Sequence, residues 1–190
     1  ENKIFNTNKF MYELLGEKKM GTLNQITKND LVIGDSTAEN TLFYYARFDC
    51  SVCNDFYMHN FEKLTNDFIK TGKIKVVFRY LTHESKQVTL QTTLGMYKAY
   101  ASGNFETFMK SVHENYPIRD VAQIDDLYMN TAHNSTSKNS EDLENYILNL
   151  ANEIRASGIN STPTFILGNQ RMVGFSNYKD LYDFIEGNRN

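Results

Sequence analysis

The chain has 190 residues, of which 41% are hydrophobic and 23% are charged, and its formal net charge at pH 7 is −3. This length suits one domain, or a small domain that carries an insertion. The slightly acidic balance, without a basic patch interleaved with aromatic residues, argues against a nucleic-acid partner. No apolar run approaches the roughly 20 residues that a membrane-spanning helix needs.

The N-terminal segment carries the weakest structural signal. The chain begins with Glu1 rather than Met, which we interpret as a mature or truncated form after removal of a signal peptide. An expression product can begin in the same way, so export is an inference at this point. Residues 1–19 are expected to form an N-terminal arm, with a short helix around Lys9–Leu15 as one interpretation.

A strand, a helix and a second strand follow one another between residues 41 and 81. Residues 41–47 are rich in aromatic side chains and predict a buried strand. One apolar stripe then follows helical spacing, through Cys53, Tyr57, Phe61, Leu64 and Phe68. Gly72 is expected to end the helix, and residues 74–81 predict a β-branched and aromatic strand. Together they predict a parallel βαβ unit.

Residues 84–152 show helical patterns and are predicted to form a helical insertion. A polar stretch over residues 134–139 is typical of a loop. Ser140 is expected to be the N-cap of the next helix, which has acidic residues in its first turn and ends at Gly158.

The C-terminal part returns to strands. Residues 164–167 and 171–175 predict two strands joined by a tight turn, and residues 178–185 predict a final helix. We therefore expect an α/β protein in which residues 20–83 and 153–190 form one domain, whose sheet is interrupted by the helices.

The motif that carries chemistry is a pair of cysteines at the start of the first predicted helix. Cys50 and Cys53 are the two cysteines of the chain. The unsatisfied N–H groups and the positive dipole end of a helix stabilise a thiolate on Cys50, which is therefore the candidate nucleophile. Cys53 begins the apolar stripe, so it is expected to point inward and to act as the resolving thiol.

A redox pair has three alternatives, each of which is less well supported: chance spacing, a zinc site and a structural disulfide. Two cysteines placed at random in such a chain fall three apart only about 1% of the time. A structural zinc site needs about four ligands, whereas the histidines show no ligand spacing and there is no second cysteine pair. A purely structural disulfide of so short a span adds little stability. We expect no metal and no cofactor.

Pro163 stands between Thr162 and the predicted strand over residues 164–167. A proline is tolerated at the start of a strand without any functional role. A cis Thr162–Pro163 bond would leave the Thr162 backbone free to pair with an extended substrate beside the cysteines. Few X-Pro bonds are cis, so the residues alone favour trans.

The chain resembles the DsbA-like branch of the thioredoxin superfamily from about residue 30 to its C-terminus. A Gly-x-x-x-Thr-Pro-Thr-Phe element that follows a Cys-x-x-Cys motif is a fairly specific sign of this family, whereas either motif alone is only a modest one. The matching segments are Ile33-Gly34-Asp35, residues 43–53, residues 158–165, and Gly174 with Tyr178 and Leu181.

The resemblance implies a thioredoxin-like fold with an inserted helical domain and a cis Thr162–Pro163 bond packed against the cysteines. It also implies bacterial export to the periplasm and disulfide exchange with reduced or misoxidised client proteins. A membrane quinone-linked oxidase is then the expected reoxidising partner, and we expect a monomer.

Four residues near the cysteines are expected to tune the reaction: Tyr44, Asp49, Ser51 and Val52. Many relatives carry His at the position of Val52 and a buried carboxylate at the position of Tyr44. Asp49 should disfavour a thiolate on Cys50 if its charge lies close. We therefore predict a less acidic Cys50 and a less oxidising couple than in the strongest oxidases of the family.

The leading interpretation is a dithiol oxidase that passes its disulfide to client proteins. A disulfide isomerase or reductase of the same fold is the rival within the same chemistry, and Thr162 slightly favours it. A non-redox thioredoxin-fold enzyme or a redox-inert binding module is the alternative outside that chemistry. Retention of both cysteines argues against a non-redox enzyme.

Overall fold

The computed structural model describes residues 6–7, 10–14, 21–131 and 140–190. Within these residues the chain forms one seven-stranded sheet in the order β1-β2-β7-β6-β4-β5-β3. The strands are β1 (Asn6–Thr7), β2 (Phe10–Leu14), β3 (Leu31–Ile33), β4 (Asn40–Ala46), β5 (Ile74–Tyr80), β6 (Thr164–Leu167) and β7 (Gln170–Val173).

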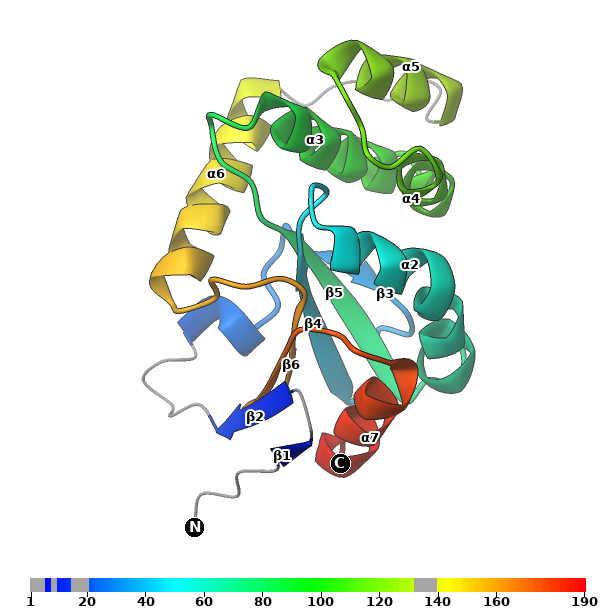
Figure 1. Cartoon of the computed structure of the whole chain (residues 1–190), viewed down its shortest axis with the longest axis vertical. Coiled ribbons are helices and arrows are strands. Elements are labelled where there is room, and N and C mark those ends of the chain that lie inside the picture. Colours follow the sequence, from blue (N-terminus) through cyan, green and yellow to red (C-terminus); the bar gives the residue numbers. More distant parts are fainter. Residues whose placement is uncertain (1–5, 8–9, 15–20, 132–139) are drawn as a thin grey trace.

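Helices surround this sheet (Figure 1). They are the short 3₁₀ helix η1 (Gly21–Asn24), α2 (Ser51–Leu64) with its π-helical continuation η2 (Thr65–Ile69), α3 (Gln87–Ala101), α4 (Phe105–Glu114), α5 (Val121–Thr131), α6 (Ser140–Ala156) and α7 (Tyr178–Asn188). Within the described residues, none of the helices has both the length and the apolar character needed to cross a membrane.

The predicted βαβ unit is confirmed. β4 and β5 pair in parallel from Asn40 opposite Ile74 to Ala46 opposite Tyr80, and α2 connects them. On its other side β4 pairs antiparallel with β6, which forms the expected hairpin with β7. β4 therefore lies in the interior of the sheet, and the cysteines follow shortly after its end.

The alternating side chains of β4 divide the core in two. Leu42, Tyr44 and Ala46 belong to the cluster that includes residues of α2, α3, α4 and α7. Phe43 and Tyr45 belong to the other cluster, to which η1 and α6 contribute. This period of two is what a strand buried on both faces of a sheet requires.

Three expectations need correction or extension. The short helix around Lys9–Leu15 is wrong, because residues 10–14 form β2, which pairs antiparallel with β7. β3 was not expected, since three residues are too few to show periodicity and pairing with β5 makes them a strand. α6 begins at Ser140 itself, which was expected to be its N-cap, and it continues to Ala156, just before the Gly158 that was expected to end it. The predicted loop over residues 134–139 lies outside the described residues.

A buried ion pair joins the sheet to the segment before β3. Arg79 of β5 is fully buried and donates to both carboxylate oxygens of Asp30, at 2.9 and 2.7 Å. It also donates to the Tyr45 hydroxyl at 2.9 Å and to the Gln25 carbonyl at 2.8 Å. The guanidinium carbon lies 4.8 Å from the centre of the Phe43 ring. A buried charge with this many partners is compatible with the interior.

Arg79→Met is expected to lower the free energy of unfolding by about 3–5 kcal/mol, because it leaves the Asp30 carboxylate buried without its partner. Urea denaturation followed by circular dichroism measures this. Lys179→Met is the matched control, since Lys179 pairs with Asp183 on the exposed side of α7 and its loss should have no measurable effect. A loss below about 1 kcal/mol for Arg79→Met would contradict the prediction.

Candidate active site

Cys50 occupies the N-cap of α2, at the end of the loop that follows β4. Its sulfur accepts a hydrogen bond from the backbone N–H of Cys53 at 3.2 Å. Its carbonyl accepts from the N–H of Asn54 at 3.0 Å, and its own N–H donates to the Arg47 carbonyl at 3.3 Å. The first turn of the helix therefore presents an N–H group to the Cys50 sulfur, where it stabilises a negative charge.

The segment before β6 faces the same sulfur. The Cys50 thiol donates to the carbonyl of Thr162 at 3.6 Å. The Thr162–Pro163 peptide bond is cis, and the Pro163 carbonyl accepts from the N–H of Gly174 at 2.7 Å. Residues more than a hundred positions apart in the sequence therefore meet at Cys50.

The two thiols have opposite electrostatic environments. A hydrogen bond from the Cys53 side chain lowers the pKa of Cys50 to about 6, and the Thr162 side chain and the backbone N–H groups of Cys53 and Val52 act in the same direction. Burial raises the pKa of the Cys53 thiol, which is 0% exposed. Cys50 is half-buried and ionises first, so it is the thiolate of the pair at neutral pH.

Arg47 is a site residue that no motif of the sequence indicates. Its guanidinium binds the Asp49 carboxylate through two hydrogen bonds, of 2.8 and 2.7 Å. Asp49 was expected to disfavour the Cys50 thiolate, but Arg47 compensates its charge at close range. The hydrogen bonds with Asp49 raise the pKa of Arg47, and a negative charge on Cys50 raises it further, so the guanidinium and the sulfur attract one another.

The remaining residues that were expected to tune the reaction differ in how deeply they are buried. Ser51 and Val52 lie in the first turn of α2 and are exposed, with Val52 at 41%. Tyr44 lies in the core at 1% exposure, and its hydroxyl has no hydrogen-bond partner among the described residues. Val52 is therefore placed to contact a bound molecule, whereas Tyr44 is enclosed by the protein.

A second group of polar residues lies between α2, β5 and α4. The Tyr80 hydroxyl lies 3.4 Å from Nε2 of His113, and Nδ1 of His113 lies 2.8 Å from Oδ1 of Asn54. Burial lowers the pKa of His113 to about 3, so its ring is neutral at physiological pH. His113 lies four residues after Met109 on the apolar side of α4, which is a sequence signal for burial, but nothing in the spacing indicates its contact with Asn54.

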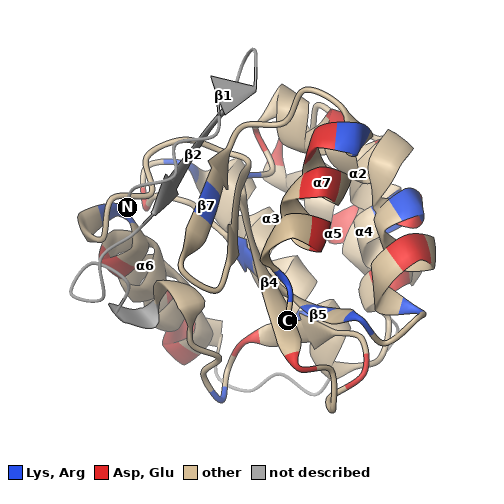
Figure 2. Cartoon of the chain, turned by 90° about the horizontal axis from the view of Figure 1, so that it is seen from below, with Lys and Arg blue, Asp and Glu red and all other residues tan. Residues whose placement is uncertain are grey.

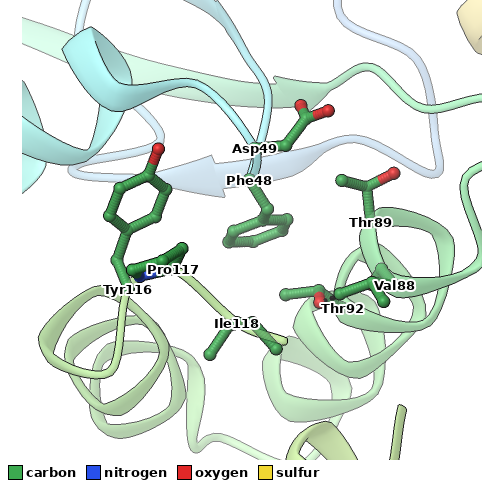
Figure 3. Close-up of a pocket in the computed structure, with 8 residues that line it drawn as sticks. All are labelled: Phe48, Asp49, Val88, Thr89, Thr92, Tyr116, Pro117 and Ile118. Carbon is green, nitrogen blue, oxygen red and sulfur yellow. Dashed lines mark hydrogen bonds between the residues drawn. The ribbon is translucent and has the colours of Figure 1, made fainter. Parts of the chain in front are cut away.

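A small pocket of about 100 Å³ opens beside the cysteine loop. Figure 3 shows the Phe48 ring pointing into it, between residues of α3 on one side and the α4–α5 connection on the other. Its lining residues are Phe48, Asp49, Val88, Thr89, Thr92, Tyr116, Pro117 and Ile118. Because Asp49 directly precedes Cys50, the pocket adjoins the loop that carries the reactive sulfur.

Positively and negatively charged side chains are mixed over the described surface. Figure 2 shows Lys and Arg interspersed with Asp and Glu over the helices around the sheet. In the described part of the chain, no group of three or more His, Cys, Asp or Glu side chains is arranged to hold a metal ion.

Comparison with known proteins identifies the family of the chain. The Thioredoxin family model matches residues 26–187. The chain therefore belongs to the thioredoxin family, and it has a thioredoxin-like fold with helices between β5 and β6. No curated protein sequence matches it.

Solved structures share the fold at low sequence identity. BdbD from Bacillus subtilis is 20% identical with a TM-score of 0.70, over 85% of this chain and 93% of that one. The catalytic domain of Proteus mirabilis ScsC is 18% identical with a TM-score of 0.73, over 90% and 95%. The thiol-disulfide exchange protein α-DsbA2 from Wolbachia pipientis is 18% identical with a TM-score of 0.73, over 90% and 94%. The fold is therefore DsbA-like.

The pKa of Cys50 predicts the pH dependence of its reactivity. In the reduced protein, the rate of alkylation by iodoacetamide should rise through a midpoint near pH 6 and then level off, because the thiolate is the reactive form. Arg47→Ala is expected to move the midpoint upward by roughly half a pH unit, since Asp49 then lies unpaired near the sulfur. Asp49→Asn should move it downward, and equal midpoints in all three proteins would show that the pair does not act on the thiolate.

Proposed function

We propose that this chain is a protein thiol–disulfide oxidoreductase that works through Cys50 and Cys53. The observation that carries the proposal is the asymmetry of the pair. Cys50 is half-buried at a helix N-terminus with a lowered pKa, and Cys53 is a buried thiol whose backbone N–H donates to the Cys50 sulfur. An accessible thiolate beside a protected thiol is what disulfide exchange requires.

In the oxidising direction, the thiolate of a reduced client attacks the sulfur of Cys50 in the Cys50–Cys53 disulfide. A bond forms between the client and Cys50, the bond to Cys53 breaks, and Cys53 leaves with the electron pair. A second client thiolate then attacks the client sulfur and releases Cys50. The client is oxidised to a disulfide and the pair is reduced to two thiols. Because the pKa of Cys50 is low, it is a good leaving group in the last step.

Client binding is proposed to involve Thr162 and Pro163. The Thr162 carbonyl lies 3.6 Å from the Cys50 sulfur, so an extended client segment bound to Cys50 runs beside this backbone. The exposed side chain of Val52 offers a second, apolar contact. The clients are reduced or misoxidised proteins.

The direction of exchange is proposed to be oxidation, in an exported, periplasmic protein that a membrane quinone-linked partner reoxidises. A stabilised Cys50 thiolate supports this direction, because it stabilises the reduced form and makes the disulfide a stronger oxidant. The pKa of about 6 lies between the value of about 3.5 in DsbA and about 7 in thioredoxin. That intermediate value keeps an isomerase or reductase as the second candidate.

The reduction potential, measured by equilibration with glutathione, distinguishes these directions. We expect a value between about −120 mV, as in DsbA, and about −180 mV, as in protein disulfide isomerase. A value near about −270 mV, as in thioredoxin, would identify a reductase. Refolding of scrambled ribonuclease then distinguishes an isomerase from an oxidase, since an oxidase alone reshuffles wrong disulfides poorly.

Cys53→Ala is expected to accumulate a mixed disulfide with a peptide that contains a disulfide, because Cys50 attacks it and no resolving thiol releases it. Mass spectrometry of the acid-quenched reaction measures the adduct. Cys50→Ala is the matched control and should form less than about a tenth as much, since Cys53 is buried. Equal amounts of adduct in both variants would contradict the assignment of Cys50 as the nucleophile and Cys53 as the resolving thiol. The absence of adduct in both variants would refute the proposed function.

A further inference from the structure

The hydroxyl of Tyr44 is a polar group without an evident structural purpose. Tyr44 is almost completely buried, and its oxygen makes no hydrogen bond within the described residues. Leaving a buried hydroxyl unpaired is destabilising, because its lost hydrogen bonds to water are not replaced. A phenylalanine would fill the same space, so the surroundings of the hydroxyl decide whether another state of the protein gives it a partner.

The packing of Tyr44 places it between the two segments that form the site. Tyr44 belongs to the same buried cluster as Cys53, and its ring centre lies 5.1 Å from that of Phe56, one turn after Cys53 in α2. On the other side it stacks on Phe165, at 5.3 Å, two residues after Pro163. The side chain is therefore held between the cysteine helix and the strand that follows the Thr-Pro segment.

The electrostatics of the Tyr44 hydroxyl connect it to the sulfurs. Burial raises the pKa of Tyr44 well above its ordinary value, and negative charges on Tyr80, Cys53 and Cys50, together with the Tyr80 oxygen as a neighbouring acceptor, raise it further. The hydroxyl therefore keeps its proton at neutral pH and lies close enough to both sulfurs to respond to their charge. A protonated hydroxyl in an apolar core can act only as a donor toward a thiolate.

A second buried tyrosine near the cysteines has its hydrogen already engaged. The Oδ1 atom of Asn54 is an acceptor, so the Nδ1 atom of His113, 2.8 Å away, carries the proton of the neutral ring. Nε2 of His113 is therefore an acceptor and takes the hydrogen of the Tyr80 hydroxyl, at 3.4 Å. This arrangement directs the Tyr80 hydrogen toward His113, so the Tyr80 oxygen faces Tyr44 as an acceptor and the Tyr44 hydroxyl is the donor that can turn to a nearby thiolate.

We propose that Tyr44 is a catalytic residue of the exchange reaction, whose hydroxyl donates a hydrogen bond to the Cys53 sulfur as the disulfide opens. The inference rests on the proposed function. An incoming thiolate forms a bond to Cys50, the Cys50–Cys53 bond breaks, and the electron pair stays on Cys53. This thiolate forms in an apolar core, where the Tyr44 O–H stabilises it until it takes a proton from solvent.

The same hydrogen bond acts when the disulfide closes. Cys53 then attacks the mixed disulfide at Cys50 and must first give up its proton, and the hydroxyl again stabilises the thiolate. Because Cys53 is a protonated thiol in the fully reduced protein, the hydrogen bond favours the transition state over both end states. Its loss should slow opening and closing together and leave the redox equilibrium nearly unchanged.

The test is the rate at which dithiothreitol opens the disulfide of the oxidised full chain at neutral pH. Acid quenching, maleimide labelling and mass spectrometry count the thiols. Tyr44→Phe is expected to slow opening about tenfold, as for the loss of a hydrogen bond to a charged group, and to leave the equilibrium constant with glutathione within about twofold. Slower opening together with a larger shift of the equilibrium constant would show a general loosening of the core and overturn the inference.

Two variants serve as controls. Tyr146→Phe removes another buried hydroxyl that lacks a partner among the described residues, but its surroundings are Thr27, Asp30 and Tyr97 rather than the cysteines. Its opening rate should equal that of the wild type. Tyr80→Phe should change the rate less than about threefold, because the Tyr80 hydrogen points to His113.

The outcomes separate the two proposals. If the wild-type disulfide exchanges with thiols and Tyr44→Phe opens at the same rate, the role of Tyr44 is refuted while the proposed function stands. If Tyr80→Phe opens as slowly as expected for Tyr44→Phe and Tyr44→Phe does not, Tyr80 is the donor and the inference is equally overturned. If the wild-type cysteines neither form nor exchange a disulfide, the proposed function itself fails.

Discussion

The chemistry of this chain depends on one contact, the hydrogen bond from the backbone N–H of Cys53 to the sulfur of Cys50 at 3.2 Å. It exists because the chain leaves β4, turns within three residues and starts α2 with Cys50 as its N-cap. β4 pairs with β5 on one side and with β6 on the other, so the turn that follows β4 and the Thr162 segment that precedes β6 adjoin neighbouring strands of one sheet. Residues distant in sequence are thereby held around one sulfur atom.

Burial separates the two thiols, although they are chemically identical. The fold lowers the pKa of Cys50 from an unfolded value of about 8.5 to about 6. The reduced protein therefore gains stability from this thiolate, fully above about pH 8.5, and loses it as the pH falls through about 6. Burial raises the pKa of Cys53 and keeps that thiol protonated. The fold thus stabilises the reduced pair with one negative charge, which increases the oxidising power of the disulfide near neutral pH.

The βαβ unit could be predicted from the sequence because long apolar segments with a clear period dominate those elements. β2 and β3 could not, since their few residues become strands only by pairing with β7 and β5. At the site, the Cys-x-x-Cys motif and the Thr-Pro element point to Cys50, Cys53 and Thr162, which the structure brings together at one sulfur. The compensation of Asp49 by Arg47 was missed, because such a pairing follows from side-chain geometry that no spacing rule encodes.

A charged group and a neutral hydroxyl are buried on opposite faces of the sheet, and their surroundings differ. On one face Arg79 is surrounded by Asp30, Tyr45 and a backbone carbonyl, which together satisfy a charge that would otherwise be destabilising. On the other face, in the cluster that contains Cys53, the hydroxyl of Tyr44 is left without a partner among the described residues. The hydroxyls of Thr27 and Tyr146, on the side of Arg79 and Asp30, also lack a partner among the described residues, so an unpaired hydroxyl does not by itself mark a functional group. Tyr44 differs from them in its position beside Cys53, where the proposed exchange develops a negative charge, and this position is what assigns its hydroxyl to the reaction.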